Sequence, residues 1–276
     1  MVKKIILGIA IALVLLVAAF FIFIYPSFNN FLKTETVQFD STLTIVLGGG
    51  GNSGILVTDS AVVVIDTKMS KPAEEFSKLA KEKAGSKKII VINTHYHGDH
   101  INGNSFYKGS KIIIGNYGEE FLHKNVKPEL MPNTFVKDSM ALALGNDTVM
   151  LYNLGQAHTL NDVVVYLKSR KLLFSGDLIF NKMNPVLKKE SGADIDKWIK
   201  ALENILARDI NTIVPGHGKL GGKELASSLK QYFEDMKTAV AEPAKEAELK
   251  AKYSDWFKMP MMASPEKTIE YLKSKN

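Results

Sequence analysis

The chain has 276 residues, of which 46% are hydrophobic and 23% charged, and this balance excludes a disordered polypeptide and predicts a globular protein with a substantial core. The formal charge of +6 reflects a mild excess, mostly of lysine, without the arginine and aromatic clusters of a nucleic-acid-binding surface, so we expect no nucleic-acid partner. The absence of cysteine excludes disulfides and thiolate metal ligands.

The N-terminal sequence predicts a membrane anchor. Residues 5–25 contain no charged or strongly polar side chain, and a helix of that length, at about 1.5 Å per residue, spans roughly the 30 Å hydrocarbon core of a bilayer. Lys3 and Lys4 precede it, so we expect a single-pass protein of the cell membrane, with residues 1–4 in the cytoplasm and the rest of the chain on the extracytoplasmic side. The alternative is a signal peptide cut after Ala19, and we favour the anchor because that cut would leave an apolar stub.

Pro26 ends the predicted helix, and residues 26–35 are predicted to be a tether before a globular domain that covers residues 36–276. Glycines are concentrated between Gly48 and Gly54, where we expect a hairpin loop, with a mobile flap as the alternative. Short β-rich runs predict strands at 42–47, 54–58, 61–66, 87–93, 111–116, 148–154, 162–167, 171–176 and 211–214.

Helices are predicted between these strands. Residues 71–85 form a helical pattern with a glycine at its end, and apolar residues at helical spacing predict two more helices, from Ile195 to Leu206 and from Leu225 to Val240. Residues 243–276 show weaker periodicity and are predicted to be a C-terminal helical tail. Strand runs separated by single helices indicate an α/β layered fold.

The segment THYHGDH, from Thr94 to His100, holds three of the six histidines of the chain and an aspartate. His95 and His97 are two residues apart at the end of a predicted strand, so their side chains point to the same side. Asp99 and His100 follow where a helix is expected to start, which brings four ligand-type side chains into one small volume. The segment therefore predicts a metal site whose remaining ligands come from elsewhere in the chain.

Three further ligand candidates lie at the ends of predicted strands: His158 in GQAHTLND, Asp177 in SGDLIF and His217 in VPGHG. For Asp177 the alternative role is the capping of a turn. His123 lies in a predicted exposed helix, and we do not expect it to bind metal.

Taken in order, these motifs resemble those of the metallo-β-lactamase superfamily of hydrolases, over about residues 40–220. The resemblance implies a four-layer αβ/βα sandwich with the metals at one edge of the sheets, and it makes residues 36–276 the catalytic domain. It implies one metal held by three histidines, a second held by an aspartate and two histidines, and an aspartate near or between them: His95, His97 and His158; Asp99, His100 and His217; and Asp177.

The ligand set suggests the metal and the reaction. Imidazole and carboxylate without sulfur suit Zn²⁺, with Fe or Mn as alternatives, and we expect two zinc ions per chain. Zinc lowers the pKa of bound water to about 7, which supplies hydroxide as a nucleophile at neutral pH. Asp99 is the predicted catalytic residue because it would orient that hydroxide. The predicted function is hydrolysis of an ester, thioester, lactone or lactam bond in a small molecule by a membrane-anchored dinuclear zinc enzyme.

Two departures separate the chain from the commonest form of the β-lactamase branch. That form, which this chain otherwise resembles, has a cysteine at the position of Asp177. It also has a lysine, which binds the substrate carboxylate, at the position of Phe180. An aspartate there is typical of glyoxalase II-like thioesterases and of lactonases. Lys182, the nearest lysine, is the candidate for binding an anionic substrate group, with a solvated surface lysine as the alternative. An iron-dependent oxidoreductase of the same fold, similar to persulfide dioxygenases, is the alternative function.

Overall fold

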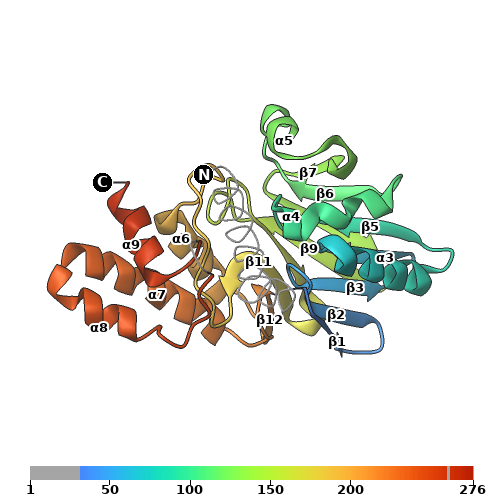
Figure 1. Ribbon diagram of the computed structural model, residues 1–276. Helices are drawn as coiled ribbons and strands as arrows, with labels where there is room; N and C mark the ends of the chain where they lie inside the picture. Colours follow the sequence, from blue (N-terminus) through green and yellow to red (C-terminus); the bar gives the residue numbers. More distant parts are fainter. Residues whose placement is uncertain (1–31, 260–261, 276) are drawn as a thin grey trace, which may run out of the picture.

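The computed structural model describes residues 32–259 and 262–275, and it is built around two β-sheets (Figure 1). The first sheet has the strand order β1-β2-β3-β4-β5-β6-β7, and the second has the order β12-β11-β10-β9-β8. The strands are β1 (Thr34–Gln38), β2 (Leu43–Gly48), β3 (Ser53–Val57), β4 (Ala61–Ile65), β5 (Lys88–Ile92), β6 (Lys111–Gly115), β7 (Thr134–Val136), β8 (Ser139–Leu144), β9 (Asp147–Asn153), β10 (Val163–Leu167), β11 (Leu172–Phe180) and β12 (Thr212–His217).

Helices cover the outer faces of both sheets. Helix α3 (Ser70–Ala84) packs on the first sheet, whereas α6 (Ile195–Leu206) and α7 (Glu224–Ala241) pack on the second (Figure 1). The predicted four-layer αβ/βα sandwich is therefore confirmed. The remaining helical segments are α4 (Gly98–Ile101), η2 (Asn102–Tyr107), α5 (Glu119–Asn125), η3 (Pro128–Leu130), η4 (Lys168–Arg170), η5 (Pro243–Lys245), α8 (Glu246–Ala251) and α9 (Pro265–Lys273).

Strand β4 shows why the central strands are apolar along their whole length. Its side chains alternate between two buried faces, as expected for a strand between two layers. Val63 and Ile65 face the second sheet, whereas Val62 and Val64 face α3 and Phe76. Burying a side chain of this size contributes about 1.5–3 kcal/mol. One short run of residues therefore holds three layers together.

The C-terminal helices pack on the second sheet and extend its core. Trp198 of α6 is fully buried, and its indole Nε1 donates a hydrogen bond to the carbonyl of Leu178 at 2.9 Å. Residues from α7, α8 and α9 join the same apolar cluster. Helix α9 begins with Pro265 after an N-cap serine, Ser264, whose side chain accepts a hydrogen bond from the backbone N–H of Lys267. The predicted C-terminal tail thus packs against the sandwich.

Strand β1 begins before the predicted end of the tether. Thr34 and Glu35, the last residues of the predicted tether, pair with β2 and belong to the first sheet. The predicted membrane span, residues 5–25, lies outside the described residues. Within residues 32–259 and 262–275, we find no helix whose length and apolar character would let it cross a membrane.

Candidate metal centre

The seven predicted metal ligands converge from separate segments of the two sheets. Their ligand atoms form two neighbouring groups, and the atoms of each group lie within 4.8 Å of one another. Four of the ligands follow β5, one lies between β9 and β10, one lies within β11 and one ends β12: His95, His97, Asp99 and His100; His158; Asp177; and His217.

The irregular course of β11 brings Asp177 to this point. The pairing of β11 with β12 shifts register on either side of Gly176, whose φ is +53°. A Cβ atom on Gly176 would lie 2.4 Å from Oγ1 of Thr94. Glycine is therefore required both by the backbone conformation and by the close approach of β11 to the segment that follows β5.

The first group contains three imidazoles around a common centre, together with Asp177. Nδ1 of His97 lies 3.1 Å from Nε2 of His95 and 3.0 Å from Nε2 of His158. Three ring nitrogens at this separation are arranged as ligands of one cation.

Asp99 and His217 define the second group, and Asp177 lies between the two groups. Oδ2 of Asp99 is 3.2 Å from Nε2 of His217 and 3.5 Å from Nε2 of His100. Oδ2 of Asp177 faces the first group, at 3.4 Å from Nε2 of His158, whereas its Oδ1 faces the second, at 3.0 Å from Nε2 of His100. One carboxylate thus offers an oxygen to each group.

The two groups differ in the proton affinity of their imidazoles. Burial lowers the pKa of His97 to about 4 and that of His158 to about 3, so both rings are neutral near pH 7, as metal ligands must be. In the second group burial also disfavours the charged ring, but Asp177 and Asp99 outweigh it and raise the pKa of His217 to about 9. A proton therefore competes with a metal ion in the second group only.

Unsatisfied polar atoms support the presence of cations at this centre. Nε2 of His100 and Oδ1 of Asp177 are buried, and among the described residues neither has a hydrogen-bond partner, although the two atoms are 3.0 Å apart. Buried polar atoms are normally satisfied, and a bound cation would satisfy both. The donor chemistry, nitrogen and oxygen without sulfur, also fits borderline metals such as zinc.

Outer contacts fix which ring nitrogen faces the centre, and they involve a residue that the sequence analysis missed. Asp66 follows β4, and its Oδ2 accepts hydrogen bonds from Nδ1 of His100 at 2.8 Å and from Oγ1 of Thr94 at 2.8 Å. Nδ1 of His95 is 3.1 Å from the same Oγ1. Because each Nδ1 is engaged in this way, Nε2 of both histidines is left to bind metal.

Lys68, which the sequence analysis also missed, fixes the glycine-rich turn between β2 and β3. Lys68 is fully buried, and its ammonium donates to three carbonyl oxygens: those of Val46 at 2.9 Å, Gly48 at 2.5 Å and Gly51 at 3.0 Å. A Cβ atom on Gly51 would lie 2.2 Å from the ring of His100. The turn is thus the predicted hairpin loop, and it is packed against a metal ligand.

Of the other residues considered from the sequence, His123 and Lys182 have partners outside the two groups, whereas Phe180 contacts a ligand. His123 is exposed in α5, and its Nε2 is 3.5 Å from Glu119. Lys182 is also exposed, and its ammonium forms an ion pair with Asp255 at 3.2 Å. Phe180 is buried, and its ring stacks on the ring of His217 with 5.6 Å between the centroids. The position three residues after Asp177 is thus an apolar wall of the centre.

Comparison with known proteins identifies the family. The model of the metallo-beta-lactamase superfamily matches residues 46–217, which contain all seven ligands. The chain belongs to the metallo-β-lactamase superfamily. It is 30% identical over 179 residues to a metallo-beta-lactamase type 2 of Bacillus cereus, covering 63% of this chain and 69% of the relative. A metallo-beta-lactamase type 2 of Bacteroides fragilis is 25% identical over 197 residues, covering 70% and 78%.

Solved structures agree with this assignment. The metallo-beta-lactamase from Pontibacter korlensis superposes with a TM-score of 0.63 at 25% identity, covering 72% of this chain and 99% of the other. The superfamily match and the assembled ligand groups together identify a metal-dependent hydrolase.

Proposed function

We propose that the chain is a dinuclear zinc hydrolase that opens an ester, thioester, lactone or lactam bond of a small molecule. The observation that carries this proposal is the pair of ligand groups with Asp177 between them, because one carboxylate with an oxygen toward each group suits two neighbouring ions. The relatives named as metallo-beta-lactamases place lactams among the substrates to be tested.

The side chains around the centre suit hydrolysis in a partly dry site. Zinc, when bound, makes water more acidic and polarises a carbonyl group. Asp99 is the most exposed carboxylate of the centre, with 23% of its side chain accessible, so it can orient an incoming water and take its proton. Phe180 and Trp198 lie against His217 and His158 and exclude water from the rear of the site.

A substrate panel tests the proposal. Purified protein loaded with zinc is assayed with nitrocefin, with lactones and with thioesters, before and after treatment with a chelator. We expect hydrolysis of at least one class, loss of that activity with the chelator and its return with zinc. If zinc-loaded protein with two metals bound hydrolyses none of these substrates, the proposed reaction is wrong.

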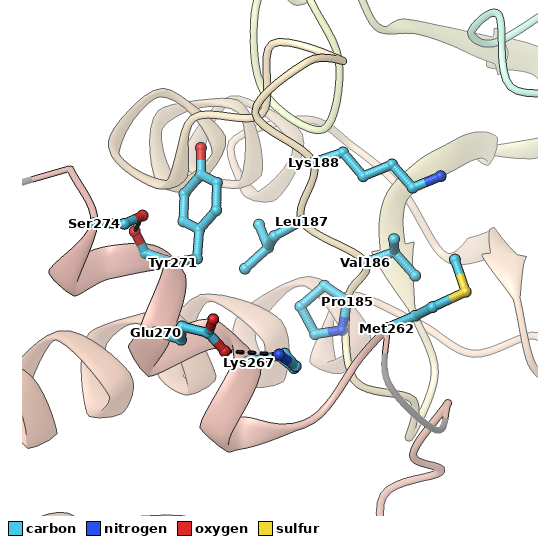
Figure 2. Close-up of a pocket in the computed structure, with 9 residues that line it drawn as sticks. All are labelled: Pro185, Val186, Leu187, Lys188, Met262, Lys267, Glu270, Tyr271 and Ser274. Carbon is cyan, nitrogen blue, oxygen red and sulfur yellow. Dashed lines mark hydrogen bonds and ion pairs between the residues drawn. The ribbon is translucent and has the colours of Figure 1, made fainter.

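Lys182 and Lys188 are the first two lysines after Asp177 in the chain, and we infer that Lys188 is better placed to bind an anionic substrate group. Lys182, the candidate from the sequence, is exposed and paired with Asp255. Among the described residues we find no ion-pair partner for Lys188, and its charge adds to the effect of burial in lowering the pKa of His97. In Figure 2 the ammonium of Lys188 points away from α9.

We expect Lys188→Ala to raise KM for an anionic substrate by about tenfold, the value of one charge-assisted hydrogen bond, and to leave KM for a neutral substrate unchanged. Lys182→Ala is the matched control and should leave both values unchanged. Steady-state kinetics of the two variants measure this. A rise in KM with Lys182→Ala alone would instead support the prediction made from the sequence.

We also propose that residues 5–25 anchor the enzyme in the cell membrane, with the catalytic domain on the extracytoplasmic side. The support is the uninterrupted apolar composition of this segment after Lys3 and Lys4. Intact-mass measurement of the protein extracted from membranes should give the full chain. A mass that lacks residues 1–19 would show that the segment is a cleaved signal peptide.

A further inference from the structure

The loop between β11 and α6, residues 181–194, contacts the first ligand group through the side chain of Ser191. Ser191 is buried, with 2% of its surface exposed, and its Oγ lies 3.0 Å from Nε2 of His97. When Nδ1 of His97, which faces His95 and His158, binds a metal ion, Nε2 carries the ring proton and donates a hydrogen bond to Oγ of Ser191. Outer partners of this kind orient metal-binding histidines.

A second contact holds the Ser191 hydroxyl in place. The hydroxyl of Tyr96 donates to Oγ of Ser191 at 2.9 Å, and Tyr96 is itself buried. Oγ of Ser191 therefore accepts two hydrogen bonds, one from His97 and one from Tyr96. The orientation of the His97 ring depends on where the backbone of the loop places Ser191.

The C-terminal helix α9 and the residues after it hold the end of this loop. The Tyr271 hydroxyl donates a hydrogen bond to the carbonyl of Ala193. The ammonium of Lys275 lies 3.0 Å from Oδ2 of Asp194 and 3.3 Å from the same carbonyl. In the opposite direction, Lys189 of the loop donates to the carbonyl of Ser274 at 2.8 Å.

Another C-terminal segment holds the start of the loop. The backbone N–H of Phe257 donates to the carbonyl of Lys182 at 2.8 Å, and the backbone N–H of Asn184 donates to the carbonyl of Phe257 at 3.0 Å. The loop is therefore attached to the C-terminal region near both of its ends.

Between these attachments the loop and α9 do not pack closely. An open pocket of about 310 Å³ lies between them, lined on one side by Pro185, Val186 and Leu187 and on the other by Glu270 and Tyr271 (Figure 2). Close packing cannot position the loop where a pocket separates it from α9. The loop is held near its ends by the hydrogen bonds and the ion pair, and by Met183 and Ala193, which are buried in the same apolar cluster as residues of α9.

The residues that make these attachments come after the part of the chain that matches the superfamily. The superfamily model ends at residue 217, whereas Phe257, Tyr271 and Lys275 lie further along. Helix α9 is fixed to the body of the protein, because Ile269 and Tyr271 belong to the same apolar cluster as α6 and α7. A rigid element that lies outside the shared segment thus contacts a loop that touches a metal ligand.

We propose that the C-terminal helix α9 positions the first metal site, acting through the β11–α6 loop and the Ser191 hydroxyl on the ring of His97. This inference rests on the metal centre proposed above. Ser191, Tyr271 and Lys275 are positioning residues, since none of them belongs to the ligand groups. Their loss should weaken the first metal site and leave the second unchanged.

The test measures metal affinity, which does not depend on the identity of the substrate. Zinc affinity is determined by competition with a chromophoric chelator, and the geometry of the first site is followed by the visible spectrum of the cobalt(II) protein. We expect Ser191→Ala to weaken zinc binding at the first site about tenfold or more, and the double variant Tyr271→Phe/Lys275→Met to weaken it roughly threefold. Both should change the cobalt spectrum.

Tyr253→Phe is the matched control. Tyr253 is another buried C-terminal tyrosine, and its hydroxyl donates to Asp235 at 2.9 Å, away from the loop. Its loss should lower thermal stability about as much as Tyr271→Phe without changing zinc affinity or the cobalt spectrum. A merely structural role of Tyr271 predicts that the two tyrosine variants behave alike.

A double-mutant cycle decides the route of the effect. If α9 acts through Ser191, the Tyr271→Phe/Lys275→Met change should have no further effect on zinc affinity in the Ser191→Ala background. Additive effects, or a double variant with the zinc affinity of the wild type, would overturn the inference. Failure of the wild-type protein to bind metal would overturn the metal centre itself, so the two failures are distinguishable.

Discussion

Replacing Asp177 with alanine is expected to lower the metal content from about two ions per chain to about one, and to reduce hydrolysis by at least about 10²-fold. Asp177 is buried, and its two oxygens face different ligand groups. Such a carboxylate can contact two metals at roughly 2.0–2.2 Å each. Without it the second group retains Asp99, His100 and His217 but loses the oxygen that it shares with the first.

His123→Ala is the control for this variant, because His123 is an exposed histidine that forms a pair only with Glu119 in α5. It should change neither metal content nor activity. Both variants should fold, since neither residue contributes to the apolar clusters between the layers. Atomic absorption and hydrolysis rates measure the outcome. Two metals and full activity in Asp177→Ala would reduce Asp177 to a residue that shapes a turn.

Acidification is expected to remove the second metal before the first. Asp177 and Asp99, acting against burial, raise the pKa of His217 to about 9, and the same carboxylates raise the pKa of His100 above its usual value. A metal ion must displace the protons of these two rings. Each proton therefore weakens metal binding by about tenfold for every unit by which the pH lies below the pKa of its ring. Burial keeps the pKa of His97 at about 4, so the first metal meets no such competition until the solution is far more acidic.

The measurement is metal content after dialysis at low zinc concentration, at about pH 8 and at about pH 5.5. We expect about two ions per chain at the higher pH and about one at the lower, with a parallel loss of hydrolysis. The Asp177→Ala variant is the control, because it should hold about one ion at both values. Simultaneous loss of both metals, or earlier loss of the metal bound by His95, His97 and His158, would contradict the assignment of the two groups.

The ligands of the centre could be predicted from the sequence because each is marked locally. His95, His97, Asp99 and His100 occur within one short segment, and His158 and His217 each stand beside a strand. The layers could be predicted as well, because a run such as that of β4 is apolar on both faces. In contrast, β8 was missed because its alternating residues are only partly buried at the edge of the second sheet.

The residues that orient the ligands could not be predicted, because their partners are remote in sequence. Ser191 is 94 residues from His97, and Asp66 is 34 residues from His100. Neither lies in a motif that indicates metal chemistry. Asp66 has a left-handed backbone, with φ of +54°, at the end of an apolar strand. The structure shows this conformation, but the sequence does not.

Distance along the chain does not by itself decide which lysine would bind the substrate. Lys182 is the nearest lysine after Asp177, but the backbone turns there, with φ of +51° at Lys182, and its side chain is directed to Asp255 on the surface. Lys188 follows six residues later, on the loop that returns to the centre with Ser191. The turn that separates them depends on tertiary contacts with Phe257.

Metal analysis of the full chain, purified without added metal, tests the dinuclear zinc centre most directly. Inductively coupled plasma mass spectrometry would be applied together with a protein concentration determined independently. The two ligand groups, with Asp177 between them, predict close to two zinc ions per chain. One iron per chain, with no zinc, would contradict the dinuclear zinc centre and favour the iron-dependent oxidoreductase instead.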